Sequence, residues 1–303
     1  MHQTNPQRGG ANDVLILSIA ILGICTTGPI IAASSVPALA LAASRCLAGA
    51  LLIGAVSLLR HKVQWRALSA REWRAAALAG VFLALHFATW IPSIRLTTVA
   101  SSTALVATQP VWAALFARAR GIHISRAMWL GIGISLVGAL SLAGTDFAVS
   151  SPRALLGDAL ALLGAILAAA YVTAGERVRS SVNTAVYSSI AYAVAGSSLL
   201  LLCFATGTKT FGWDKPQWTS IIALTFFGQI IGHTLINRVL LTTSATVTST
   251  AILFEMPGST LIAAVWIKQH PPLAVWPALV LVLIGLYVVV RAQTSQADGL
   301  RRR

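Results

Sequence analysis

The sequence predicts an all-α integral membrane protein in which ten transmembrane helices form two inverted five-helix repeats. Three observations lead to this prediction. The 303 residues are 56% hydrophobic and only 10% charged, whereas a soluble domain usually carries about 25% charged residues. Apolar stretches of nearly uniform length follow one another along the chain. The second half of the sequence also matches the first half at a constant offset.

The apolar stretches each approach or reach the roughly 20 residues that a helix needs to cross a bilayer. Short polar segments connect them and leave no room for a separate soluble domain. Prolines in or near the stretches, including Pro110 and Pro257, predict helix kinks or breaks. The ten predicted spans are 14–32, 38–59, 75–94, 98–117, 127–144, 155–175, 184–205, 217–237, 245–267 and 273–291.

The basic residues predict the orientation in the membrane. If the N-terminus is cytoplasmic, 16 of the 22 Lys and Arg residues fall on the cytoplasmic side, as the positive-inside rule requires. Both tails, 1–13 and 293–303, are then cytoplasmic, and we expect a multi-pass protein of the cell (inner or plasma) membrane. The net charge of +14 does not indicate a nucleic-acid partner, because the basic residues lack the aromatic interleaving of nucleic-acid binders.

A shift of 147 residues brings rare residue types into register. His86 meets His233, Pro110 meets Pro257, and Trp129 meets Trp276. Histidine, proline and tryptophan matching at one offset are more informative than matching alanines in this composition. We therefore expect repeats at 14–147 and 148–292. Because five helices is an odd number, the second repeat enters the membrane in the opposite orientation, and such proteins place their site near the midplane.

Two predicted spans carry polar stripes. Gln229, His233 and Asn237 recur every fourth residue, which is about one α-helical turn. His86 and Trp90 share a face of the third span in the same way. Such a face is costly in lipid but suits a central cavity. The alternative is hydrogen bonding between neighbouring helices.

Glu255 is expected to be the only carboxylate well inside a predicted span. A charge at the bilayer centre costs about 2.5–3.5 kcal/mol on insertion scales, which favours a functional role. The side chain would accept a proton, as a candidate coupling group, or would partner a cationic group of the substrate. The alternative is a protonated glutamate that bonds to backbone carbonyls freed by Pro257.

Three segments resemble an EamA-type member of the drug/metabolite transporter superfamily. "LGDALALLGAILAAAYVTAGERVR" (156–179) resembles the start of the second half of such a protein. "RLTTVASSTALVATQPVWAALFAR" (95–118) and "TSATVTSTAILFEMPGSTLIAAVW" (243–266) resemble the matching helices of the two halves. The resemblance covers nearly the whole chain. It implies a ten-helix exporter with inverted halves that moves amino acids, other small metabolites or drugs without ATP.

The resemblance and the repeat add further candidate residues. Arg45 is similar to an arginine early in helix 2 of family members; it would bind a substrate carboxylate or extend to the outer interface. Tyr171 resembles an aromatic residue of helix 6. Thr108 occupies the face of helix 4 that matches Glu255, and Gln109 is next to it. These two would line the cavity, or their polar groups would bond back to their own helix.

Taken together, these features predict a secondary-active transporter, an exporter of small amphipathic metabolites such as amino acids, that works by alternating access around a central cavity. Its partners would be the bilayer, a small-molecule substrate and protons as the candidate coupling ion. The sequence has no catalytic set, no phosphate-binding G-x-x-x-x-G-K-[ST] loop and no metal-ligand spacing, so we expect no enzyme activity, ATP, cofactor or metal. The alternatives are efflux of cationic drug-like compounds and a non-transporting membrane scaffold.

Overall fold

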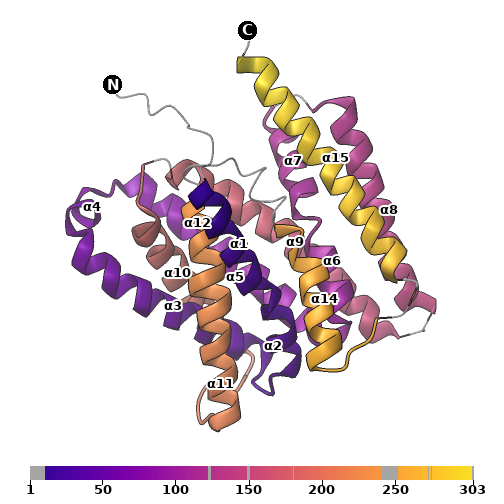
Figure 1. Ribbon diagram of the computed structural model, residues 1–303. Coiled ribbons are helices and arrows are strands. Elements are labelled where there is room, and N and C mark those ends of the chain that lie inside the picture. The colour runs from indigo at the N-terminus through magenta and orange to yellow at the C-terminus, as the bar shows by residue number, and fades with distance from the viewer. Residues whose placement is uncertain are drawn as a thin grey trace.

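The computed structural model describes residues 11–121, 124–148, 151–179, 181–239, 252–271, 273 and 275–301. Within these ranges every regular element is a helix (Figure 1). The first half contains α1 (Ala11–Cys25), α2 (Thr27–Ala33), α3 (Ala38–Arg60), α4 (Lys62–Ala67), α5 (Ala70–Leu96), α6 (Val99–Val106), α7 (Gln109–Ala119) and α8 (Arg126–Ala148). The second half contains α9 (Pro152–Arg179), α10 (Thr184–Ala205), α11 (Lys215–Ala223), the π-helix η1 (Leu224–Thr234), α12 (Leu235–Val239), α14 (Glu255–Trp266) and α15 (Val275–Arg301).

Seven helices of the described chain are long and apolar enough to cross a membrane. The predicted count of ten stays a prediction. Two of the other three spans contain shorter apolar stretches, within α8 and α15, and the third begins among residues 240–251, which lie outside the described chain. The predicted basic tail 293–303 is helical as far as Arg301, because α15 continues through it. Most of the N-terminal tail, residues 1–10, lies outside the described residues. The seven spans are 12–33, 38–60, 70–96, 99–119, 152–175, 184–205 and 215–239.

Two spans are broken at equivalent positions of the repeat. α6 ends at Val106 and α7 begins at Gln109. In the second half, turn residues 253–254 precede α14, which begins at Glu255. A proline has no N–H to donate to the carbonyl four residues earlier, and for Pro110 and Pro257 those carbonyls belong to the residues at or next to the breaks. The two prolines therefore interrupt their spans near the middle, and α7 and α14 begin there.

Helix packing joins one half of the chain to the other. α5 lies along α9, α3 lies along α10, and α8 lies along α15 at one edge of the molecule (Figure 1). α3 and α10, like α8 and α15, are related by the offset of 147 residues. α1 in turn packs on η1 and α12, which is the contact equivalent to that of α9 with α5. This pattern is the one that a pseudo-twofold axis between the halves produces; the opposite membrane orientation of the halves stays a prediction.

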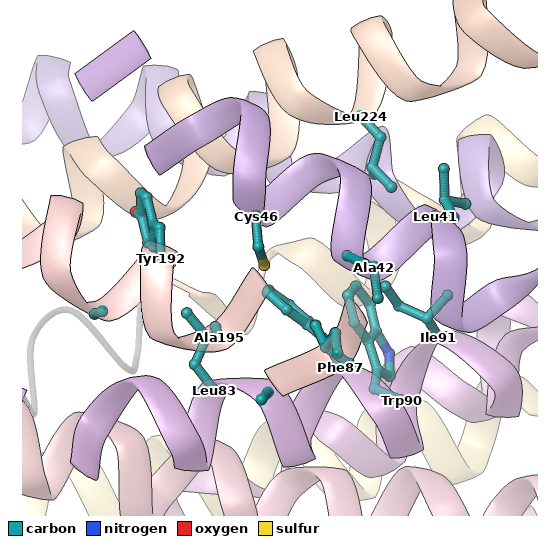
Figure 2. Close-up of a cluster of buried hydrophobic side chains, with 14 of the residues drawn as sticks. Leu41, Ala42, Cys46, Leu83, Phe87, Trp90, Ile91, Tyr192, Ala195 and Leu224 are labelled. Atoms are coloured by element: carbon teal, nitrogen blue, oxygen red, sulfur yellow. The ribbon is translucent and has the colours of Figure 1, made fainter. Parts of the chain in front are cut away.

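The largest core cluster packs side chains of α3, α5, α10 and η1 together (Figure 2). Phe87 and Trp90 of α5 lie next to each other in it, with Cys46 of α3 and Leu224 of η1 around them. All four side chains are at most 4% exposed. The cluster holds the aromatic side chains of α5 in place beside the polar residues of the neighbouring helices.

Candidate functional site

A cavity lies where helices of the two halves meet. Eight of the ten predicted cavity and coupling residues border it: Arg45, His86, Trp90, Gln109, Tyr171, His233, Asn237 and Glu255. Pro110 also borders it, together with Thr27 and several apolar residues, whereas Pro257 does not. The space open to the centre of a water molecule is about 70 Å³, which is enough for several waters. A larger solute therefore requires the surrounding helices to move apart.

Arg45 of α3 is fully buried, so it does not extend to the outer interface. Its Nε donates a hydrogen bond to Oε1 of Gln229 at 2.9 Å, and its guanidinium carbon lies 4.4 Å from the ring centroid of Phe87. The Nη1 and Nη2 atoms have no hydrogen-bond partner. A buried cation is costly unless it is paired and hydrogen-bonded. The guanidinium is therefore held at Nε and on one face, while both of its buried Nη groups are left unsatisfied.

The segment η1 supports this arginine. A Cβ atom added at Gly228 would lie 2.8 Å from Arg45 Nη2, so only glycine lets the guanidinium approach this closely. The next residue, Gln229, is fully buried and accepts the hydrogen bond from Arg45 Nε. Gln229 is not among the residues that border this cavity, and its predicted role in lining a cavity stays a prediction. η1 is a π-helix, whose turn is wider than 3.6 residues, so residues spaced by four do not share one face.

His86 and His233 bring the two halves together at an aromatic wall. His86 stacks on Trp90 with ring centroids 5.6 Å apart, and Phe87 meets His233 edge-on at 5.4 Å. Because a carbonyl only accepts, Nδ1 of His86 is assigned as the donor of its 2.9 Å bond to the Gly164 carbonyl. Nε2 of the neutral ring is then an acceptor. Nε1 of Trp90, by contrast, is buried without a partner.

Asn237 and Tyr171 border the cavity but are bonded to other helices. Nδ2 of Asn237 donates to the Tyr171 hydroxyl at 3.1 Å and to Ser188 Oγ at 3.2 Å. Oδ1 of Asn237 accepts from Arg179 Nη1 at 3.5 Å. For these residues the structure contains the interhelical hydrogen bonds of the alternative interpretation, which join α12 to α9 and α10.

The breaks place Gln109 and Glu255 at the first residue of α7 and of α14, both at the cavity. Glu255 is partly exposed there, and a carboxylate is favourable at a helix N-terminus. Thr108 is fully buried and does not border the cavity. Its hydroxyl donates to the Leu105 carbonyl of α6 at 2.6 Å, the local bonding of the alternative interpretation, and its cavity role stays a prediction.

Sequence reasoning missed Phe87 and Gly228. Both are ordinary residues of an apolar span, and only the position of Arg45 makes them part of the site. Within the described ranges, no group of three or more His, Cys, Asp or Glu residues could hold a metal ion.

Seven long apolar helices around a cavity that is bordered by polar side chains of both halves are typical of a multi-pass membrane protein. The EamA-like transporter family matches the chain twice, over residues 13–144 and 155–291, and the chain belongs to this family. It is thus a membrane transporter of the drug/metabolite transporter superfamily. The family resemblance and the two repeats predicted from the sequence are confirmed.

Comparison with solved structures agrees with the fold. A structure titled only "Crystal structure of protein" aligns with a TM-score of 0.62 at 20% sequence identity. The alignment covers 92% of this chain and 96% of the other chain. At this identity the match supports the fold alone. No curated protein matches the sequence significantly.

Proposed function

We propose that the protein is a secondary-active exporter of small amphipathic metabolites such as amino acids. The observation that carries this proposal is the cavity itself. Polar and ionisable side chains from both halves converge on one cavity in the middle of the bundle, beside a large cluster of buried apolar side chains. Intramembrane ionisable residues that face a cavity mark substrate or ion pathways.

The hydrogen bonds at the two ends of the bundle support alternating access as the mechanism. At one end the Val99 N–H donates to Gln269 Oε1 at 2.8 Å, which joins α6 to the segment after α14. At the other end Ser181 Oγ donates to Glu72 Oε1 at 2.6 Å, which joins the start of α5 to the segment after α9. Access from either side requires one of these contacts between the halves to part. Under the predicted orientation the first end is extracellular and the second is cytoplasmic.

Glu255 is the proposed coupling group. It borders the cavity at the break in its span, where opening of either end would expose it to a different side. A carboxylate so placed would take up a proton on one side and release it on the other. Flux driven by an imposed pH gradient is the expected consequence.

Efflux of cationic drug-like compounds is the weaker candidate. A cation in the cavity would share it with the buried guanidinium of Arg45, and like charges at close range are unfavourable in a low-dielectric site. A non-transporting scaffold also has no need of a cavity lined by charged groups.

The test is uptake by proteoliposomes that contain the purified full chain. Labelled amino acids are supplied singly and compared with empty liposomes, with and without an imposed pH gradient. We expect flux of one or a few of them and acceleration by the gradient. Flux of organic cations alone would favour drug efflux, and no flux of any compound would contradict the transport proposal.

A further inference from the structure

We propose that the cavity recognises a zwitterion, with a carboxylate bound by the free edge of Arg45 and an ammonium bound by Glu255. The substrate would then be a free α-amino acid, or a compound that carries the same pair of charges at similar spacing. This inference rests on the proposed transport function and specifies the substrate of that site.

The anion site is built from an arginine with one edge left over. Gln229 occupies Nε and Phe87 covers one face of the guanidinium. What remains is the pair of Nη groups, both buried and both without a hydrogen-bond partner. Two parallel N–H groups of a guanidinium match the two oxygens of a carboxylate. The site is therefore prepared for a planar anion, and Arg45 borders the cavity from which that anion would come.

The cation site comes from a different helix. Glu255 begins α14 and is partly exposed at the same cavity. It does not neutralise Arg45 by direct contact, because neither Nη atom has a partner in the described structure. The cavity thus contains one positive and one negative group that are not bonded to each other. The Glu255 carboxyl is hydrogen-bonded to Thr27 but does not contact the Arg45 Nη groups, so an ammonium is its charge complement.

The two charges together select against singly charged solutes. A simple carboxylic acid would bind Arg45 and leave Glu255 without a cationic partner, and a simple amine would bind Glu255 and leave Arg45 without an anionic partner. A buried charge without a partner is strongly unfavourable, and such unpaired groups are a common source of specificity. A zwitterion satisfies both groups and brings no net charge into the membrane.

The stacked pair His86 and Trp90 borders the same cavity. These rings offer an apolar surface for the rest of the substrate. Because they do not carry the selectivity for charge, that selectivity can be tested while the side chain of the substrate is held constant.

The test compares three forms of one molecule as competitors of proteoliposome uptake. Each of the twenty common amino acids is screened first. The best of them is then compared with its carboxamide, which lacks the carboxylate, and its N-acetyl derivative, which lacks the ammonium. We expect each derivative to compete at least about 10-fold more weakly, the scale of one charge-assisted hydrogen bond.

Variants assign each charge to its residue. In Arg45→Gln, the amino acid and its carboxamide should compete equally well. In Glu255→Gln, the amino acid and its N-acetyl derivative should compete equally well. Arg60→Gln is the matched control, since Arg60 ends the same helix and is exposed; it should keep the wild-type preferences. Arg45→Lys retains the charge in case the glutamine variant does not fold.

The outcomes separate this inference from the transport proposal. Equal competition by all three forms in the wild type overturns the zwitterion site but leaves transport intact. The same holds if only monocarboxylates or only organic cations are carried. Flux of no compound at all overturns both.

Discussion

Two buried arginines, Arg45 and Arg179, lie in contrasting surroundings. Arg179 donates to Asn237, which is bonded in turn to Tyr171 and Ser188. Arg45 has one partner, Gln229, and two Nη groups with none. The first set leaves one buried atom, Arg179 Nε, without a partner, whereas the second leaves both Nη atoms of Arg45 and Nε2 of Gln229. A polar cluster that is nearly complete holds helices together, and one with several unsatisfied donors is a place for a ligand. The predictions below test this difference.

The largest effect is expected for Arg45→Gln. Transport should fall by about 100-fold, because a charge-assisted interaction with the substrate is lost. The melting temperature should hold or rise, because removing a buried guanidinium whose Nη groups lack hydrogen-bond partners relieves its desolvation cost. Uptake and thermal unfolding of the same preparation measure the two effects. A large loss of stability would show that Arg45, like Arg179, holds helices together rather than binding the substrate.

Glu255→Gln should abolish the response to a pH gradient, because a carboxamide does not titrate. Exchange of substrate across the membrane should persist at a reduced rate. Uptake at a series of imposed gradients measures the change. Unaltered acceleration by the gradient would rule out Glu255 as the coupling group.

Asn237→Ala should lower stability. Truncation leaves the Tyr171 hydroxyl and the Arg179 guanidinium without their shared partner, and an unsatisfied buried polar group costs about 1–3 kcal/mol. The measurement is thermal unfolding in detergent. The comparison between the two arginines would fail if this variant kept its stability and lost only substrate affinity.

Gly228→Ala should weaken substrate binding by about 10-fold, since the new methyl group would lie 2.8 Å from Arg45 Nη2 and displace the guanidinium. The control is Gly133→Ala in α8, where an added Cβ atom meets nothing within 4 Å. Concentration dependence of uptake measures both. Equal affinity in the two variants would mean that the position of Arg45 does not matter.

Much of the fold could be predicted from the sequence, because a bilayer imposes a length of about 20 residues on each span. The repeat also predicted that prolines interrupt two of the spans. The breaks lie two to four residues before Pro110 and Pro257, near the carbonyl groups to which a proline cannot donate. The predicted count of ten spans stays a prediction, since part of the span 245–267 lies outside the described residues.

The site was harder to predict, for reasons that particular residues illustrate. Residue type marked His86, His233 and Glu255 as unusual in an apolar span, and they border the cavity. Spacing alone did not place Gln229, because nothing in an apolar sequence distinguishes a π-helix from an α-helix. Residue type alone did not place Thr108, because a hydroxyl can bond to a carbonyl of the preceding turn at little cost. Helix rotation and local hydrogen bonding are tertiary properties, and one sequence does not determine them.

The most direct test of the account is thermal unfolding of the wild type and of Arg45→Gln, each with and without a saturating concentration of the best-transported amino acid. A ligand that binds only the folded state raises the melting temperature. We expect a rise for the wild type and little or none for the variant. An equal rise in both proteins would show that the free edge of Arg45 does not bind the substrate.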